Sequence, residues 1–116
     1  MNTLRNKVSL IGRLGQQPEV MKFDSGSMKT SILIATNEPY KDKNGEWMDN
    51  TQWHNAYAWG ATGERMSKKL DKGSEVVIEG RLVNRSYETK AGEKRYITEI
   101  EVNGFLLLSP KTATNS

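Results

Sequence analysis

The side chains best suited to chemistry lie in one ten-residue segment, 51–60, which contains two of the three Trp and the only His. In a strand, alternate side chains point to opposite faces. One face would be large and mostly aromatic, with Trp53, Asn55, Tyr57 and Trp59. The other would be small, with His54, Ala56 and Ala58. Either the aromatic face packs into a core, or the small face does and the rings form an exposed patch of the kind that marks binding sites.

Catalytic and metal chemistry find little support in the sequence. His54 has no partner His or Cys at metal-ligand spacing, and no recognisable nucleophile motif accompanies it. The chain has no Cys, which excludes disulfides and thiolate chemistry. The acids Asp42, Glu46 and Asp49 match no calcium or magnesium loop, and no Gly-rich phosphate cradle is present. We therefore expect a protein that is not an enzyme and holds no metal or cofactor.

Length and charge indicate one small domain that is compatible with a polyanionic partner. The chain has 116 residues, with 17 Lys and Arg against 14 Asp and Glu, for a net charge of +3. This mild excess of positive charge is compatible with a nucleic-acid partner but does not by itself establish one. No apolar run exceeds four residues, so we expect neither a secretory signal nor a membrane span, and a cytoplasmic protein.

The order of the expected elements predicts an all-β fold. Apolar patterning predicts strands at 7–14, 28–36, 51–60, 74–83 and 96–102, the last continued weakly over 105–108. Residues 19–23 read as a short extended segment. Polar stretches with turn signals predict long hairpin arms at 37–49 and 87–94. Thr62 as a cap and Gly73 as a stop predict one short helix between the third and fourth strands.

This pattern favours a five-stranded OB barrel, a partly open Greek-key barrel. A plain β-sandwich and an SH3-like barrel remain alternatives. We expect residues 1–109 to form the OB domain and residues 110–116 to form a short disordered tail.

Aromatic and basic residues coincide on the predicted arms and the central strand. Tyr40 lies on the first arm and Tyr87 on the second, and both arms carry Lys or Arg. Unpaired nucleic acid is held by bases that stack on rings while cations follow the phosphates. The alternative is that these rings serve core or arm packing. Trp47, at the base of the first arm, is compatible with either role.

A resemblance to a known family adds to this interpretation. The chain resembles bacterial single-stranded DNA-binding proteins over residues 4–108, in consistent order and spacing. The matching motifs are Asn6-Lys7-Val8, Gly12-Arg13-Leu14-Gly15, Pro18-Glu19-Val20, Thr51-Gln52-Trp53-His54, Lys72-Gly73-Ser74, Glu79-Gly80-Arg81-Leu82 and Arg95-Tyr96. The resemblance implies an OB-fold subunit, usually of a homotetramer, that coats single-stranded DNA during replication, recombination and repair.

Carried over position by position, the resemblance assigns roles to individual residues. The base-stacking rings fall on Tyr40, Trp53, Trp59 and Tyr87, which implies that the rings of the central strand face outward. Basic residues that match phosphate-facing positions are Lys7, Lys72, Arg85 and Arg95. His54 falls where the family places a subunit contact.

The chain also departs from the family pattern. Familiar members often carry Lys or Arg at four positions where this chain has other residues, namely Asn55, Ala61, Asp71 and Ser86. We therefore expect its affinity for single-stranded DNA to fall less steeply with salt concentration than in those members. The family typically continues to an acidic tip that recruits other proteins, whereas residues 112–116 carry no acid. We therefore expect a short form without the acidic C-terminal tail, in which recruitment is lost or uses another surface.

Two rival functions follow from the same residues. An OB-fold binder of RNA, or a specialised primosome-type accessory protein, would use rings and weak basicity in the same way. A nuclease on an OB scaffold would need a clustered acid pair with a metal, or a His–nucleophile pair, and the sequence shows neither.

Overall fold

The computed structural model describes residues 3–109, so the expected tail at 110–116 lies outside the described residues. A 3-10 turn, η1 (Thr3–Arg5), precedes the first strand. The strands are β1 (Val8–Leu14), β2 (Glu19–Lys22), β3 (Met28–Asn37), β4 (Tyr40–Lys41), β5 (Trp47–Met48), β6 (Thr51–Trp59), β7 (Glu75–Glu88) and β8 (Lys94–Ser109). The helix α1 (Gly60–Lys69) lies between β6 and β7.

Five long strands close into a barrel in the order β1-β7-β8-β6-β3, with β3 returning to β1. The β6–β8 pairing is parallel and the others in the ring are antiparallel. The seam between β1 and β3 is short: it joins only Arg13 to Ala35 and Leu14 to Ile34. The expected all-β OB barrel, with one short helix between the third and fourth long strands, is confirmed.

The barrel interior is aliphatic. Ile32 and Ile34 point inward from β3, as the alternation predicts, and Val76 and Ile78 point inward from β7. The helix covers one end of the barrel with Met66, and Leu70 follows at its C-cap; both side chains are fully buried. Ala56 and Ala58 complete the core from β6.

The helix begins earlier than the sequence indicates. The backbone turns at Gly60, which has a φ of 60°, and α1 starts there directly after β6. Trp59 therefore occupies the N-cap position without a side-chain cap hydrogen bond, and Thr62 lies inside the first turn. The expected cap at Thr62 is wrong because no loop separates strand and helix. The expected end of the helix at Lys68 and Lys69 is confirmed, and Gly73 lies in the turn that follows.

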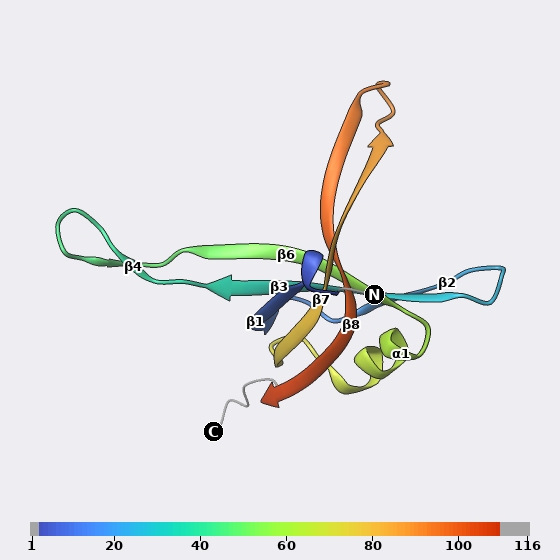
Figure 1. Cartoon of the computed structure of the whole chain (residues 1–116), viewed down its shortest axis with the longest axis horizontal. Helices are drawn as coiled ribbons and strands as arrows, with labels where there is room; N and C mark the ends of the chain where they lie inside the picture. Colours follow the sequence, from blue (N-terminus) through green and yellow to red (C-terminus); the bar gives the residue numbers. More distant parts are fainter. Residues whose placement is uncertain (1–2, 110–116) are drawn as a thin grey trace.

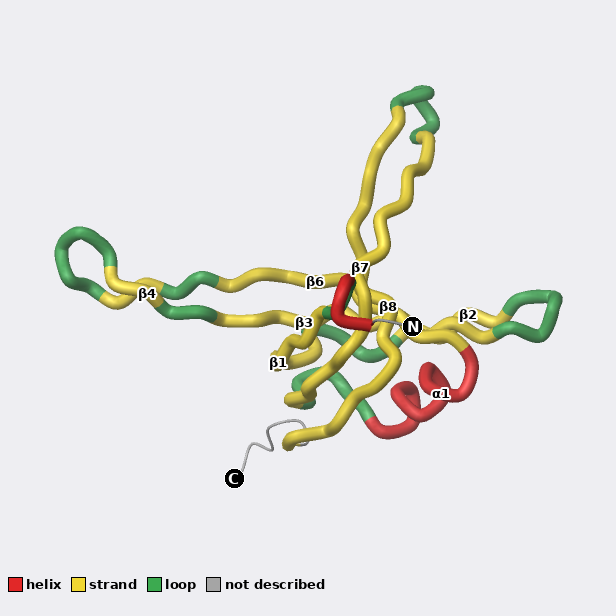
Figure 2. The backbone as a smooth tube through the Cα atoms, viewed as in Figure 1, coloured by secondary structure: helices red, strands yellow, loops and turns green. Residues whose placement is uncertain are grey.

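Three hairpin arms project from the barrel (Figure 1; Figure 2 shows their looped tips). The first arm extends β3 and β6 and ends in the small β4–β5 ladder. The second is the far half of the β7–β8 hairpin, which stays paired from Gly80 and Val102 out to Glu88 and Lys94. The third, which we call the β2–β3 arm, spans residues 19–31. Its extended segment at 19–23, the turn at 24–27 and a strand from residue 28 are predictable from the sequence, whereas the pairing of β2 with β3 is not.

Candidate nucleic-acid interface

The two indole rings of β6 lie on the outside of the barrel. Trp53 is 57% exposed and Trp59 is 45% exposed, whereas Ala56 and Ala58 are buried. The small face of β6 is therefore the core face, and the prediction that the rings point outward is confirmed. Two large flat side chains on a solvent-facing sheet make an exposed apolar patch.

Tyr57 shares this outer face but is only 8% exposed. The Nζ atom of Lys29 lies 4.6 Å from the centre of its ring, and Trp59 meets the ring edge-on at 6.4 Å between centroids. Burial, with the carboxylates of Glu101 and Glu99 nearby, raises the pKa of the Tyr57 phenol. Tyr57 therefore packs against Lys29 and Trp59 and exposes little of its own ring.

Trp53 is held in place by a close contact with Gly15, the residue that follows β1. A methyl group at Gly15 would come within 2.4 Å of the Cζ3 atom of Trp53, so the ring occupies the space that any side chain at Gly15 would need. Trp53 also lines a hollow of about 240 Å³, together with Asn55 and Leu82, at the point where β8 diverges from β6. This hollow leads from the indole towards the β7–β8 arm.

The other two predicted stacking rings lie on the arms. Tyr40 on β4 and Tyr87 on β7 are both about half exposed. The arms run in different directions from the barrel (Figure 1). Within residues 3–109, ring pairs join Trp59 to Phe23 and to Tyr57, and none reaches Tyr40 or Tyr87. The four predicted rings are therefore separate from one another in the free protein.

Three of the four predicted phosphate contacts already pair with a carboxylate. Lys7 lies 3.2 Å from Glu79, Arg85 donates to Glu99 at 2.8 Å, and Arg95 donates to Glu93 at 2.7 Å. The hydrogen bond to Glu99 raises the pKa of the Arg85 guanidinium, which therefore stays charged. The fourth residue, Lys72, follows the helix, and its backbone N–H donates to Gln17.

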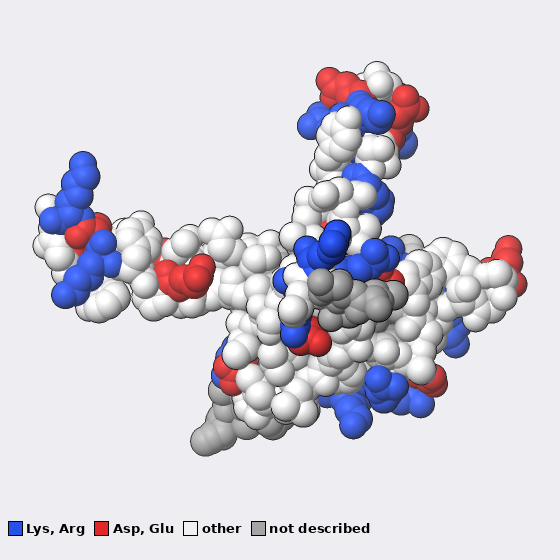
Figure 3. Space-filling model, in the orientation of Figure 1, with Lys and Arg blue, Asp and Glu red and all other residues white. Residues whose placement is uncertain are grey.

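On the face drawn in Figure 3, basic and acidic side chains are mixed. Figure 3 shows Lys and Arg interleaved with Asp and Glu at the tips of the first arm and of the β7–β8 arm, with a further group of basic side chains over α1. Among the described residues, six basic side chains lie within salt-bridge distance of a carboxylate: Lys7, Arg13, Lys68, Arg81, Arg85 and Arg95.

Sequence reasoning missed Phe23 and Lys29. The rings of Phe23 and Trp59 lie 5.8 Å apart between centroids at 37°, and Lys29 lies over both Tyr57 and Trp59. Both residues reach the outer face through the pairing of β3 with β2 and β6, and this register cannot be seen in one sequence. Trp47 is exposed beside Lys41 at the arm tip, so it does not pack into the core.

His54 alternates with Trp53 along β6, is half-buried, and also lines the hollow beside Trp53. Its Nε2 atom is 2.9 Å from the hydroxyl of Thr36, and it lines a hollow of about 310 Å³ with Ser9, Leu10 and Ile11. These three residues belong to the part of β1 beyond its short seam with β3. His54 therefore faces an open strand edge.

In the described part of the chain, no helix has the length and apolar character needed to cross a bilayer. Over the same residues, no three His, Cys, Asp or Glu side chains come together as a metal ion would require.

Comparisons with known proteins agree on one family. A family described as the single-strand binding protein family matches residues 5–108. Single-stranded DNA-binding protein 1 of Chlorobaculum tepidum is 42% identical over 107 residues, which cover 91% of this chain and 66% of the relative. The chain thus spans slightly less than two thirds of that protein.

Two solved structures are similar in fold. The Plasmodium falciparum SSB in complex with ssDNA matches with a TM-score of 0.81 and 30% identity, covering 90% of this chain and 95% of that one. A deletion mutant of the single-stranded DNA binding protein from Thermus aquaticus matches with a TM-score of 0.78 and 26% identity, covering 90% of this chain and 50% of that one.

Proposed function

The chain belongs to the single-strand binding protein family, and from this we propose that it binds and protects single-stranded DNA without sequence specificity. Bases stack on Trp53, Trp59, Tyr40 and Tyr87, and cations follow the phosphates. The setting is DNA replication, recombination and repair in the cytoplasm. The proposal is one of binding without catalysis, so single-stranded DNA incubated with the protein and magnesium should keep its full length.

The outward position of Trp53 and Trp59 is the observation that carries the proposal. Every base has a flat π-face, so stacking on an indole is tolerant of sequence, and it contributes about 1–3 kcal/mol per base. The arms extend this surface with Tyr40 beside Lys41 and with Tyr87 opposite Arg95. A strand that follows these platforms gains affinity without base-edge hydrogen bonds.

Fluorescence titration with oligo-dT tests the proposal. Stacking should quench Trp emission, and Trp53→Ala or Trp59→Ala should weaken binding by about fivefold to 150-fold, which corresponds to the stacking energy of one base. Trp59→Phe keeps a flat ring and serves as the control that retains most of the affinity. Unchanged affinity in both alanine variants would overturn stacking as the mechanism. Tighter binding of oligo-rU than of oligo-dT would instead favour the RNA-binding alternative.

We also propose that the chain works as a homotetramer, in which His54 lies at a subunit interface. An apolar row crosses the outer face of three strands, from Ile11 through Val77 to Leu106, and its ends are 58% and 62% exposed. Next to it, the edge of β1 that faces β3 has no strand partner before Arg13 within residues 3–109. Several barrels in one assembly give a long DNA strand a continuous binding surface. The strand then binds more tightly through avidity, without new contacts on any one barrel.

Light scattering tests the assembly. Leu106→Glu places a charge in the apolar row and should lower the measured mass, while circular dichroism reports an intact fold. Val20→Glu adds the same charge on the β2–β3 arm, away from this row, and should leave the mass unchanged. A monomeric wild-type protein at micromolar concentration would contradict the proposal.

A further inference from the structure

The outer face of β6 continues onto the β2–β3 arm. In the sheet register, Trp59 lies opposite Lys29 on β3, and Lys29 lies opposite Met21 on β2. Because side chains alternate along a strand, Met21 and Phe23 share the face that carries Trp59, and Val20 and Lys22 share the other. The arm therefore widens the aromatic surface by one strand.

Phe23 and Trp59 form a partly open pair of rings. Their centroids are 5.8 Å apart at an interplanar angle of 37°, and Phe23 is 43% exposed. A tilted pair of this kind leaves ring surface uncovered on both residues. Phe23 lies outside the core cluster, so its exposed ring has no structural role in the barrel interior.

Lys29 supplies a positive charge at the same place. Its Nζ atom is 4.6 Å from the ring centroid of Tyr57 and 5.8 Å from that of Trp59. The two rings hold the ammonium group through cation–π attraction, and no Asp or Glu lies within salt-bridge distance of Lys29 among the described residues. Lys29 thus differs from Lys7, Arg85 and Arg95, whose charges already face carboxylates.

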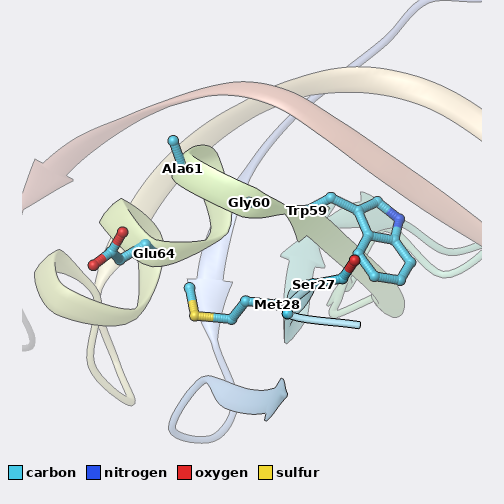
Figure 4. Close-up of a pocket in the computed structure, with 7 residues that line it drawn as sticks. Ser27, Met28, Trp59, Gly60, Ala61 and Glu64 are labelled. Atoms are coloured by element: carbon cyan, nitrogen blue, oxygen red, sulfur yellow. The ribbon is translucent and has the colours of Figure 1, made fainter. Parts of the chain in front are cut away.

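A hollow of about 500 Å³ adjoins Trp59 at the start of α1. Its walls are Gly26, Ser27, Met28, Trp59, Gly60, Ala61 and Glu64, and Figure 4 shows Trp59 and Glu64 on opposite sides of it. The volume is in the range of small-ligand sites. The only charged group in its lining is the carboxylate of Glu64, which pairs with Lys68 at 3.3 Å, and the rest of the lining is uncharged, which suits a base or a sugar.

We propose that the β2–β3 arm forms an additional nucleotide subsite. One base stacks on the ring of Trp59, in the space between Phe23 and the hollow. The ammonium group of Lys29 neutralises the adjoining phosphate. This inference rests on the proposed function, since it adds a residue pair and one nucleotide to the path over β6. None of the DNA contacts predicted from the sequence lies on the β2–β3 arm.

The stacking part is tested with Phe23→Ala and a short oligo-dT that fits one barrel. Loss of the ring should weaken binding by about fivefold to tenfold. Val20→Ala is the matched control, since it removes apolar surface from the same arm on its other face, and it should change affinity less than twofold. Circular dichroism of both variants checks that the barrel is intact.

The phosphate part is tested with Lys29→Met, which removes the charge but keeps an unbranched chain over Tyr57. One lost phosphate contact on a single strand should make the plot of log affinity against log salt less steep by about 0.7. Lys22→Met makes the same change on the opposite face of the arm and should leave the slope as it is.

The outcomes separate this inference from the function it builds on. If Trp53→Ala weakens binding while Phe23→Ala and Lys29→Met behave like their controls, the subsite is wrong and single-stranded DNA binding stands. If the wild-type protein fails to bind oligo-dT, both are wrong. A loss in both arm variants, absent from Val20→Ala and Lys22→Met, supports the subsite.

Discussion

At the scale of single residues, the orientation of Trp53 depends on the missing side chain of Gly15. A Cβ atom there would lie 2.4 Å from Cζ3 and 3.0 Å from Cη2 of the indole. The cheapest adjustment is rotation of the exposed ring, because the ring has solvent beside it. Gly15→Ala should therefore weaken oligo-dT binding by about fivefold, part of one stacking contribution, with little change in melting temperature.

Gly104→Ala is the control for this prediction, because a Cβ atom at Gly104 meets no atom within 4 Å. Fluorescence titration and a thermal melt of both variants supply the two readouts. Equal affinity in the two variants would show that Gly15 does not set the position of the indole.

Tyr57 should make stability depend on alkaline pH. Burial, then Glu101 and Glu99, raise the pKa of its phenol above the ordinary value of 10.0. The folded state therefore holds this proton more tightly than the unfolded state, so the contribution is complete below about pH 10 and is lost as pH rises through the raised pKa. Tyr57→Phe should lose less stability than the wild type between about pH 9 and pH 11 in urea unfolding. Parallel pH profiles would contradict this.

Individual side chains could be predicted from the sequence only in part. Alternation divided the residues of β6 correctly between two faces, but only the family resemblance indicated that the indoles face outward. Tyr57 follows the same alternation and is nevertheless buried, because Lys29 from β3 lies over its ring. The role of Phe23 could not be predicted either, because its neighbour Trp59 lies two strands away in the sheet and one sequence does not give the register that joins them.

At the scale of elements, regular patterns were predictable and irregular ones were not. Turn residues at Lys43-Asn44-Gly45 indicated the first arm correctly. The C-terminal strand was predicted in two pieces, whereas β8 is continuous. A register shift pairs Glu79 with Gly104 and Gly80 with Val102, and this bulge interrupts the alternation without ending the strand.

The tip of the first arm should depend on Asp42. Its carboxylate accepts hydrogen bonds at 2.9 Å from the backbone N–H groups of Asn44 and Glu46. Asp42→Ala removes both, which frees Tyr40 and Lys41 from their fixed positions at a local cost of about 1 kcal/mol. We expect oligo-dT affinity to fall about twofold to fivefold, at an unchanged melting temperature because the arm contributes nothing to the core.

Asp49→Ala removes the same charge from the same arm and controls for electrostatic attraction. If Asp42→Ala binds as tightly as Asp49→Ala, the order of the tip has no part in binding. Hydrogen exchange at the amides of residues 42–46 reports the loosening directly.

At the scale of the whole molecule, internal ion pairs should flatten the salt dependence of binding. Lys7, Arg85 and Arg95 face carboxylates in the free protein, so a phosphate has to compete for each of them. Glu79→Gln releases Lys7 and should steepen the slope of log affinity against log salt by up to about 0.7. An unchanged slope in this variant would show that Lys7 makes no phosphate contact.

The distribution of tryptophan across the molecule has a practical consequence. Trp47, Trp53 and Trp59 all lie at the surface, and the interior cluster is built from aliphatic side chains and methionine. No indole is fully buried, since Trp47, Trp53 and Trp59 are 68%, 57% and 45% exposed, so their emission maximum should shift less on melting than that of a core tryptophan. Intrinsic fluorescence should therefore respond more strongly to occupancy of the surface than to unfolding, which circular dichroism reports separately.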